Sequence, residues 1–257
     1  MRPTFIVTSA IDSEVGIFPP DIRILQTHDT VNSIKAAFPD AILVLAEGGN
    51  GNTINNPTPQ FEQLRSRFNV FLDMTANDQI KHIHDNIMAK VSNVTEMGGM
   101  SGLSKTIAEI TLLHNVFDAI KNHEQLKPIL EESDRIFKFS GRYKLSPLFN
   151  PAVYHEPSLQ GKYTFRKADK SWIPDAWQKL GIDHFYASRF WSFDTALLDD
   201  TMQAFEKMLQ DGIDIAEKGY IDVEHLLYKH LDKEKVVEFD HVHFMGAIAP
   251  NGMVIYD

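Results

Sequence analysis

The sequence contains no cysteine among its 257 residues. Disulfide bonds, thiolate metal sites and a catalytic cysteine are therefore excluded. No window approaches the roughly 18 consecutive apolar residues of a membrane-spanning helix. No apolar stretch with a small-residue cleavage site follows Met1-Arg2-Pro3-Thr4, so no signal peptide is visible. From these absences we expect a cytoplasmic protein without a membrane span.

Basic residues are scarce relative to acidic ones. The chain has 25 Lys and Arg against 35 Asp and Glu, which gives a formal net charge of −10. Proteins that bind duplex nucleic acid neutralise its phosphates with clustered Lys and Arg. The charge therefore argues against a nucleic-acid partner. It leaves room for a local basic pocket. Basic residues are most closely spaced in the segment with Arg135, Lys138, Arg142 and Lys144.

Several common catalytic motifs are also missing. The chain has no Gly-x-x-x-x-Gly-Lys-Ser/Thr loop, no Gly-x-Ser-x-Gly elbow and no His-Glu-x-x-His pair. These absences argue against nucleoside triphosphate hydrolysis, serine hydrolysis and zinc-peptidase chemistry.

The first 75 residues alternate between strand-like and helix-like patterns. Apolar runs at 4–10, 41–46 and 69–73 predict strands, and the spacing over 29–37 predicts a helix. This order predicts an α/β protein with a mainly parallel central sheet flanked by helices. Further along, the patterns predict helices at 104–122, 194–210 and 222–231, strands at 135–145 and 183–189, and a terminal apolar segment at 236–255. The length predicts a single domain over 1–257.

The segment from Lys138 to Tyr143 places two cations and a hydroxyl on a predicted inner strand. Strand alternation puts Lys138, Ser140 and Arg142 on one side. A charged stripe on an inner strand is costly unless it faces a polar ligand. Lysine and arginine together suit a diphosphate. The alternative is an edge strand whose basic face is solvated or salt-bridged.

The order of these features resembles that of GT-A glycosyltransferases, which use nucleotide-diphosphate sugars and have a Rossmann-like fold. The resemblance is one of pattern over residues 4–145 and 184–252. Its parts are the first strand Phe5–Ala10, a helix led by Arg23, Thr27, Thr30 and Ser33-Ile34, a strand that ends in Glu47, and the helix start Ser104–Glu109 before the basic strand.

The resemblance implies a donor site for a nucleotide sugar. Thr8, Ser9 and Glu47 would contact the base and ribose, with ordinary strand-end capping as their alternative. The diphosphate would be held by Lys105, Lys138, Ser140, Arg142 and His243. His243 belongs to the pair His241-Val242-His243, and its alternative is a purely structural histidine.

The family usually carries an Asp-x-Asp motif that holds Mg²⁺ or Mn²⁺ against the diphosphate. Here Lys138-Phe139-Ser140-Gly141-Arg142-Tyr143 stands in that place and contains no acid. Metal dependence is therefore open, and so is activity. Lys138 and Arg142 can supply the charge stabilisation that a cation would otherwise give to the leaving group.

The segment Gly219 to His225 resembles the acidic element that supplies the catalytic base in inverting GT-A enzymes. Asp222 suits the N-terminus of a helix, where the dipole favours negative charge. Glu224 is then available to take a proton from an acceptor hydroxyl. A glutamate at a helix start also occurs for purely local reasons.

These observations lead to one functional hypothesis and two alternatives. In the hypothesis a sugar moves from a nucleotide-diphosphate sugar to a glycan or another hydroxyl acceptor, with residues 1–150 binding the donor and 151–257 the acceptor. The first alternative is a non-catalytic module that binds a glycan or a protein on the same fold. The second is a nucleotidyltransferase, which the acidic, glycine-poor loop Ile11–Gly16 argues against.

Overall fold

The computed structural model describes every residue except 1, 14–16, 76–77, 79–98, 216–218 and 249–251. Its described residues form a seven-stranded sheet in the order β10-β6-β9-β4-β1-β2-β3. The strands are β1 (Pro3–Ser9), β2 (Ile42–Glu47), β3 (Val70–Asp73), β4 (Arg135–Ser140), β6 (Tyr163–Arg166), β9 (Phe190–Asp194) and β10 (Val236–Phe239). Strand β9 runs antiparallel to both neighbours, and the other adjacent pairs are parallel. The predicted α/β class with a mainly parallel sheet is confirmed.

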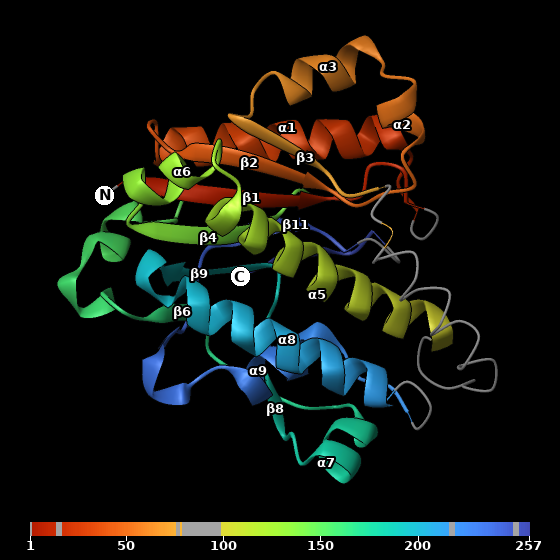
Figure 1. The fold of residues 1–257 in the computed structure, drawn as a ribbon, viewed down its shortest axis with the longest axis vertical. Coiled ribbons are helices and arrows are strands. Elements are labelled where there is room, and N and C mark those ends of the chain that lie inside the picture. The colour runs from red at the N-terminus through yellow and green to blue at the C-terminus, as the bar shows by residue number, and fades with distance from the viewer. Residues whose placement is uncertain (1, 14–16, 76–77, 79–98, 216–218, 249–251) are drawn as a thin grey trace.

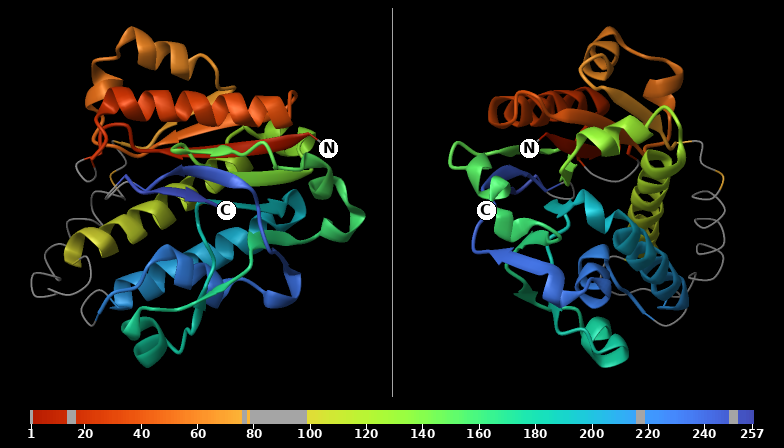
Figure 2. Two further views of the ribbon diagram at one scale, coloured as in Figure 1. Left: turned by 180° about the vertical axis from the view of Figure 1, so that it is seen from behind. Right: turned by 60° about the vertical axis from the view of Figure 1, so that its left-hand side comes forward.

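Helices and a small second sheet cover the two faces (Figures 1 and 2). One face carries α5 (Gly99–Asn122), α8 (Leu198–Ile215) and α9 (Val223–His230). The other carries α1 (Pro20–Ala37) and a sheet of β5 (Tyr143–Leu145), β11 (Phe244–Ala247) and β12 (Val254–Tyr256). The remaining elements are α2 (Asn52–Asn55), α3 (Pro59–Arg65), α6 (Lys127–Glu132), α7 (Pro174–Leu180) and the strand pair β7 (Asp169–Lys170) and β8 (His184–Phe185).

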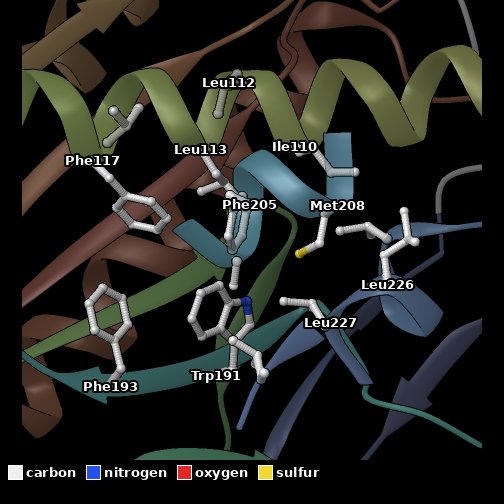
Figure 3. Packing of buried hydrophobic residues seen from close by; sticks show 14 of the residues in the cluster. Ile110, Leu112, Leu113, Phe117, Trp191, Phe193, Phe205, Met208, Leu226 and Leu227 are labelled. Atoms are coloured by element: carbon white, nitrogen blue, oxygen red, sulfur yellow. The ribbon is translucent and has the colours of Figure 1, made fainter. Parts of the chain in front are cut away.

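The larger core lies between the sheet and the helices α5, α8 and α9 (Figure 3). Phe117 of α5 stands edge-on to Phe193 of β9 and to Phe205 of α8, with ring centroids 5.6 and 5.4 Å apart. Trp191 of β9 is fully buried beside Phe205. Aromatic rings bury more surface than other side chains and pack with defined geometry. They therefore fix α5 and α8 rigidly against β9.

Polar side chains of α1 hold the start of the second sheet. The hydroxyl of Thr27 donates to the carbonyl of Gly141 (3.0 Å), and that of Thr30 donates to the carbonyl of Tyr143 (2.6 Å). The hydroxyl of Ser33 accepts from the amide of Leu145 (3.0 Å). A helix thus satisfies the backbone groups of β5 that no strand pairs on this side.

Several of the predicted elements differ from those observed. The strand expected over 135–145 ends at Ser140. The amide of Gly141 makes the last ladder bond, to the carbonyl of Thr8, and the chain then turns at Gly141-Arg142 into the second sheet. The strand expected at 183–189 is reduced to β8, and the aromatic run after it forms β9. The helices expected at 29–37 and 104–122 begin earlier, at Pro20 and Gly99.

The helix expected at 194–210 begins later than predicted. Asp194 does cap a helical turn, accepting from the amide of Ala196 (2.9 Å), but that turn is a short 3-10 helix over Thr195–Leu197. The α-helix α8 follows at Leu198.

The close approach of β11 to the turn after β4 gives the first prediction. A Cβ atom on Gly246 would lie 2.5 Å from the carbonyl oxygen of Arg142 and 2.9 Å from the Cα of Tyr143. We expect Gly246→Ala to lower the free energy of unfolding by about 1–3 kcal/mol. The matched control is Gly212→Ala in α8, whose Cβ would meet its nearest atom at 3.4 Å. Urea denaturation should show the control neutral or more stable, and equal losses in both variants would contradict the packing described.

Candidate active site

The carboxyl ends of β1, β2, β3 and β4 meet at one edge of the sheet. The register pairs Ser9 with Glu47, Glu47 with Asp73, and Thr8 with Ser140. Ligands of open α/β sheets bind outside this edge. The structure therefore gathers four of the predicted donor-site residues, Thr8, Ser9, Glu47 and Ser140, in one place.

Glu47 holds the loops that follow β1 and β2. It is 2% exposed, and its Oε1 accepts from the amides of Ile11 (2.8 Å) and Gly49 (2.9 Å). Burial raises the pKa of Glu47, while hydrogen bonds from Ser9 and the two amides act in the opposite direction. The other carboxyl oxygen, Oε2, is buried and has no hydrogen-bond partner within the described part of the chain. One oxygen of Glu47 thus has the strand-end capping role that the sequence left open.

Lys138 lies wholly inside the protein. Its ammonium donates to Oε1 of Glu109 in α5 (2.7 Å), to the carbonyl of Ser188 (2.8 Å) and to Oγ of Ser140 (3.2 Å). An ammonium has three donors, so none is left for a ligand. The salt-bridged alternative describes Lys138, because a buried charge is stable only when it is paired.

Glu224 lies on the far side of the same network. Oγ of Ser188 donates to Oε1 of Glu224 (2.7 Å), and the carbonyl of Ser188 accepts from Lys138. Burial, and then the carboxylates of Asp222 and Glu109, raise the pKa of Glu224 to about 7. A carboxyl group that changes charge near neutral pH is suited to general acid or base catalysis.

Asp222 is the N-cap of α9. Its Oδ1 accepts from the amide of His225 (3.0 Å) and contacts Nδ1 of the same residue (2.5 Å). The fully buried His225 ring reaches Oγ of Ser171 through Nε2 (2.8 Å). Asp222 therefore orients the start of the helix that carries Glu224.

Three cations, Arg23, Lys105 and Arg142, approach the same edge from three elements, and we call them the basic cluster. Arg142 lies in the turn between β4 and β5 and Arg23 in the first turns of α1. Arg23 donates to the carbonyls of Phe18 (3.0 Å) and Ala10 (2.9 Å). Nη1 of Arg142 is buried and has no hydrogen-bond partner among the described residues.

The members of the basic cluster repel one another. Burial, and then Arg142 and Arg23, lower the pKa of Lys105. Burial, and then Arg142, lower the pKa of Arg23. A further cation, Arg189, donates from Nε to the hydroxyl of Tyr143 beside Arg142 (3.1 Å). The predicted alternation of Arg142 with Lys138 does not hold, because the chain has left the strand before Arg142.

His243 is not brought to this edge. Strand β11 pairs Phe244 with Leu145, and the carbonyl of His243 accepts from the amide of Ser146 (2.8 Å). It therefore lies beyond the end of β5 that is farther from Arg142. Its amide donates to Asp257 (3.0 Å), and its ring stacks on that of His241.

Sequence reasoning did not assign Arg23, Glu109 or Ser188 to the site. A usable signal existed for Arg23, since Arg23, Thr27 and Thr30 form a polar stripe at helical spacing on a helix that must cover a sheet. Glu109 follows Lys105 by four residues, which places both on one side of α5. No local pattern marks Ser188.

Solved structures of sugar transferases share this fold. Core-mannan synthase A from Aspergillus fumigatus, in its Mn/GDP form, matches with a TM-score of 0.54 and 9% identity over 93% of this chain and 73% of that chain. The mannosyltransferase Ktr4p from S. cerevisiae matches with a TM-score of 0.55 and 9% identity over 93% of this chain and 69% of that chain. This chain has the GT-A fold. No family model and no curated protein matches its sequence.

The described residues contain neither a metal-binding cluster nor a membrane-spanning helix. In that part of the GT-A chain, no group of three or more His, Asp or Glu side chains is placed to hold a metal ion. No helix in the same part is both long and apolar enough to cross a bilayer.

The raised pKa of Glu224 predicts a pH-dependent stability. Between its ordinary value of 4.5 and about 7, the folded protein keeps a proton that the unfolded chain releases. The free energy of unfolding should therefore fall as pH rises through this window. We expect Glu224→Gln to gain stability relative to the parent protein as pH rises from 4.5 to 7, measured by urea denaturation at several pH values. Glu131→Gln, which alters an exposed carboxyl of α6, is the control, and a parallel pH profile for Glu224→Gln would contradict the environment described.

The buried ion pair predicts a second stability effect. Lys138→Met keeps most of the side-chain volume but leaves Glu109 and the carbonyl of Ser188 without their partner. We expect a loss of about 3 kcal/mol in the free energy of unfolding. Adding Glu109→Gln should recover part of this loss, because no unpaired charge remains. A double variant whose loss equals the sum of the two single losses would show that the pair is not coupled.

Proposed function

We propose that the protein transfers a sugar from a nucleotide-diphosphate sugar to a hydroxyl group of an acceptor. The GT-A fold supports this proposal, and so does the position of the polar groups at the carboxyl edge of the parallel strands. Residues 1–150 bind the donor in this proposal, with its nucleoside against Thr8, Ser9 and Glu47. Residues 151–257 bind the acceptor, which is a glycan or another compound with a free hydroxyl.

Glu224 acts as the general base in the proposed reaction. It takes the proton of the acceptor hydroxyl while the acceptor oxygen attacks the anomeric carbon, and the nucleoside diphosphate leaves with the bonding electrons of the broken C–O bond. Asp222 does not take part directly but fixes the start of α9.

The single observation that carries this proposal is the connection between Glu224 and the strand ends. Ser188 joins them, because its hydroxyl donates to Glu224 and its carbonyl accepts from Lys138 of β4, whose ammonium also contacts Ser140. A proton acceptor that titrates near neutral pH is thus held at a fixed position relative to the predicted donor site. Fixed relative positions of base and donor are what a displacement at a sugar carbon requires.

Activity should depend on the ionised form of Glu224. A panel of nucleotide sugars, each incubated with the protein and simple glycoside acceptors, should give release of one nucleoside diphosphate. We expect Glu224→Gln to lower kcat by about 10²–10⁴-fold with little change in KM for the donor, because it removes the base and not the donor contacts. In the parent protein kcat should rise with pH through about 7 as Glu224 loses its proton.

Two outcomes would count against the proposal. A Glu224→Gln variant that retains full kcat would remove the base assignment. Binding of glycans without release of a nucleoside diphosphate from any donor would favour the alternative of a non-catalytic binding module. Glu131→Gln serves as the control in these assays as well.

A further inference from the structure

The basic cluster occupies a position with a defined geometry. The amide of Gly141 donates to the carbonyl of Thr8 (2.8 Å), which draws the turn that carries Arg142 onto the end of β1. The carbonyl of Gly141 accepts from Thr27, which lies one helical turn after Arg23. Arg23 and Arg142 are therefore neighbours across the top of β1.

Lys105 approaches the same point from the other face of the sheet. Glu109, four residues later in α5, binds the ammonium of Lys138, which in turn contacts Ser140. Lys105 lies one helical turn beyond Glu109 toward the start of α5. Lys105 is exposed, and besides partial desolvation the charges of Arg142 and Arg23 lie near enough to lower its pKa. Positive groups thus meet at the strand edge from the turn after β4, from α1 and from α5.

Three of the described carboxylates lie near this edge, and none is suited to a divalent metal. Both oxygens of Asp12 accept hydrogen bonds from Thr53 (2.5 and 2.6 Å). Oδ1 of Asp73 accepts from the amide (2.9 Å) and hydroxyl (2.6 Å) of Thr75. Oε1 of Glu47 is bound to two amides. Oε2 of Glu47 has no hydrogen-bond partner among the described residues, but the cations of the basic cluster repel a divalent cation there, so these three carboxylates do not fit Mg²⁺ or Mn²⁺.

The basic cluster, which repels a divalent cation, attracts an anion. Leaving Nη1 of Arg142 buried and unpaired costs free energy, and three like charges held together cost more. A diphosphate removes both costs, since its oxygens accept from guanidinium and ammonium groups.

We propose that Lys105 and Arg142 bind a diphosphate group directly, with the buried Arg23 as a positive charge behind them, in place of a divalent metal ion. The inference rests on the proposed function in so far as the diphosphate belongs to a nucleotide sugar. In that setting Arg142 and Lys105 stabilise the charge that develops on the leaving nucleoside diphosphate. Arg23 is held by two carbonyls and supplies a fixed positive charge behind them.

Isothermal titration calorimetry with inorganic pyrophosphate in the presence of EDTA tests the proposal. We expect binding that weakens with added KCl, because the attraction is between charges. Adding Mn²⁺ or Mg²⁺ should not strengthen it. Lys105→Ala and Arg142→Gln should each weaken binding by about ten- to hundredfold, the worth of a charged hydrogen bond. Lys121→Ala on the same helix is the matched control and should bind as the parent protein does.

The outcomes separate this inference from the proposed function when nucleotide sugars are titrated alongside. Binding of pyrophosphate or of any nucleoside diphosphate only when Mn²⁺ or Mg²⁺ is present would overturn the inference and leave the proposed function standing. Metal-free binding of pyrophosphate, lost in the two variants, with no nucleotide sugar bound, would support the inference and reject the proposed function. No binding under any condition would overturn both.

Discussion

The position of one buried ammonium group governs the candidate site. Lys138 stands on β4 and joins α5, through Glu109, to the segment before β9, through Ser188. Backbone hydrogen bonds already join β4 to β9, but the contacts of α5 with the large core are mainly apolar, and apolar contacts are not directional. Hydrogen bonds to an ammonium are directional, and inside the protein they are strong. The relative positions of Glu109, Ser188 and Glu224 therefore depend on a residue whose three donors are all bound within the protein.

In this arrangement, residues that look alike in the sequence have different interactions. Lys138 and Arg142 are four residues apart on what reads as one strand, yet the first neutralises an internal carboxylate and the second remains unpaired within the described residues. The difference arises because the chain turns away from the strand at Gly141, after its last ladder bond to Thr8. Glu109 and Glu224 also differ. Glu109 is paired with a cation, while Glu224 is half-buried near the carboxylates of Asp222 and Glu109, which favours its neutral form.

The sequence was sufficient for the fold class and for the first three strands, because buried parallel strands are apolar runs bounded by Gly, Asn and Asp. It also indicated which strand ends would converge, since parallel topology requires this. It was not sufficient for the break after Ser140, because the residues that follow pair with β11, about 100 positions later in the chain. His243 could not be placed either, because the register of β11 against β5 is decided by the close approach at Gly246. Ser188 is recognisable only once Lys138 and Glu224 are seen on either side of it.

Strand β9 has a consequence for how the molecule moves. It comes from the second half of the chain but lies between β4 of the first half and β6 of the second, hydrogen-bonded on both sides in antiparallel register. Rotation of one half against the other would break the hydrogen bonds of β9 with β4 or β6 and expose the aromatic rings packed on β9. Within the described residues the two halves thus share one continuous sheet. In the proposed reaction, entry and exit of substrates at the strand edge would then fall to loops and side chains.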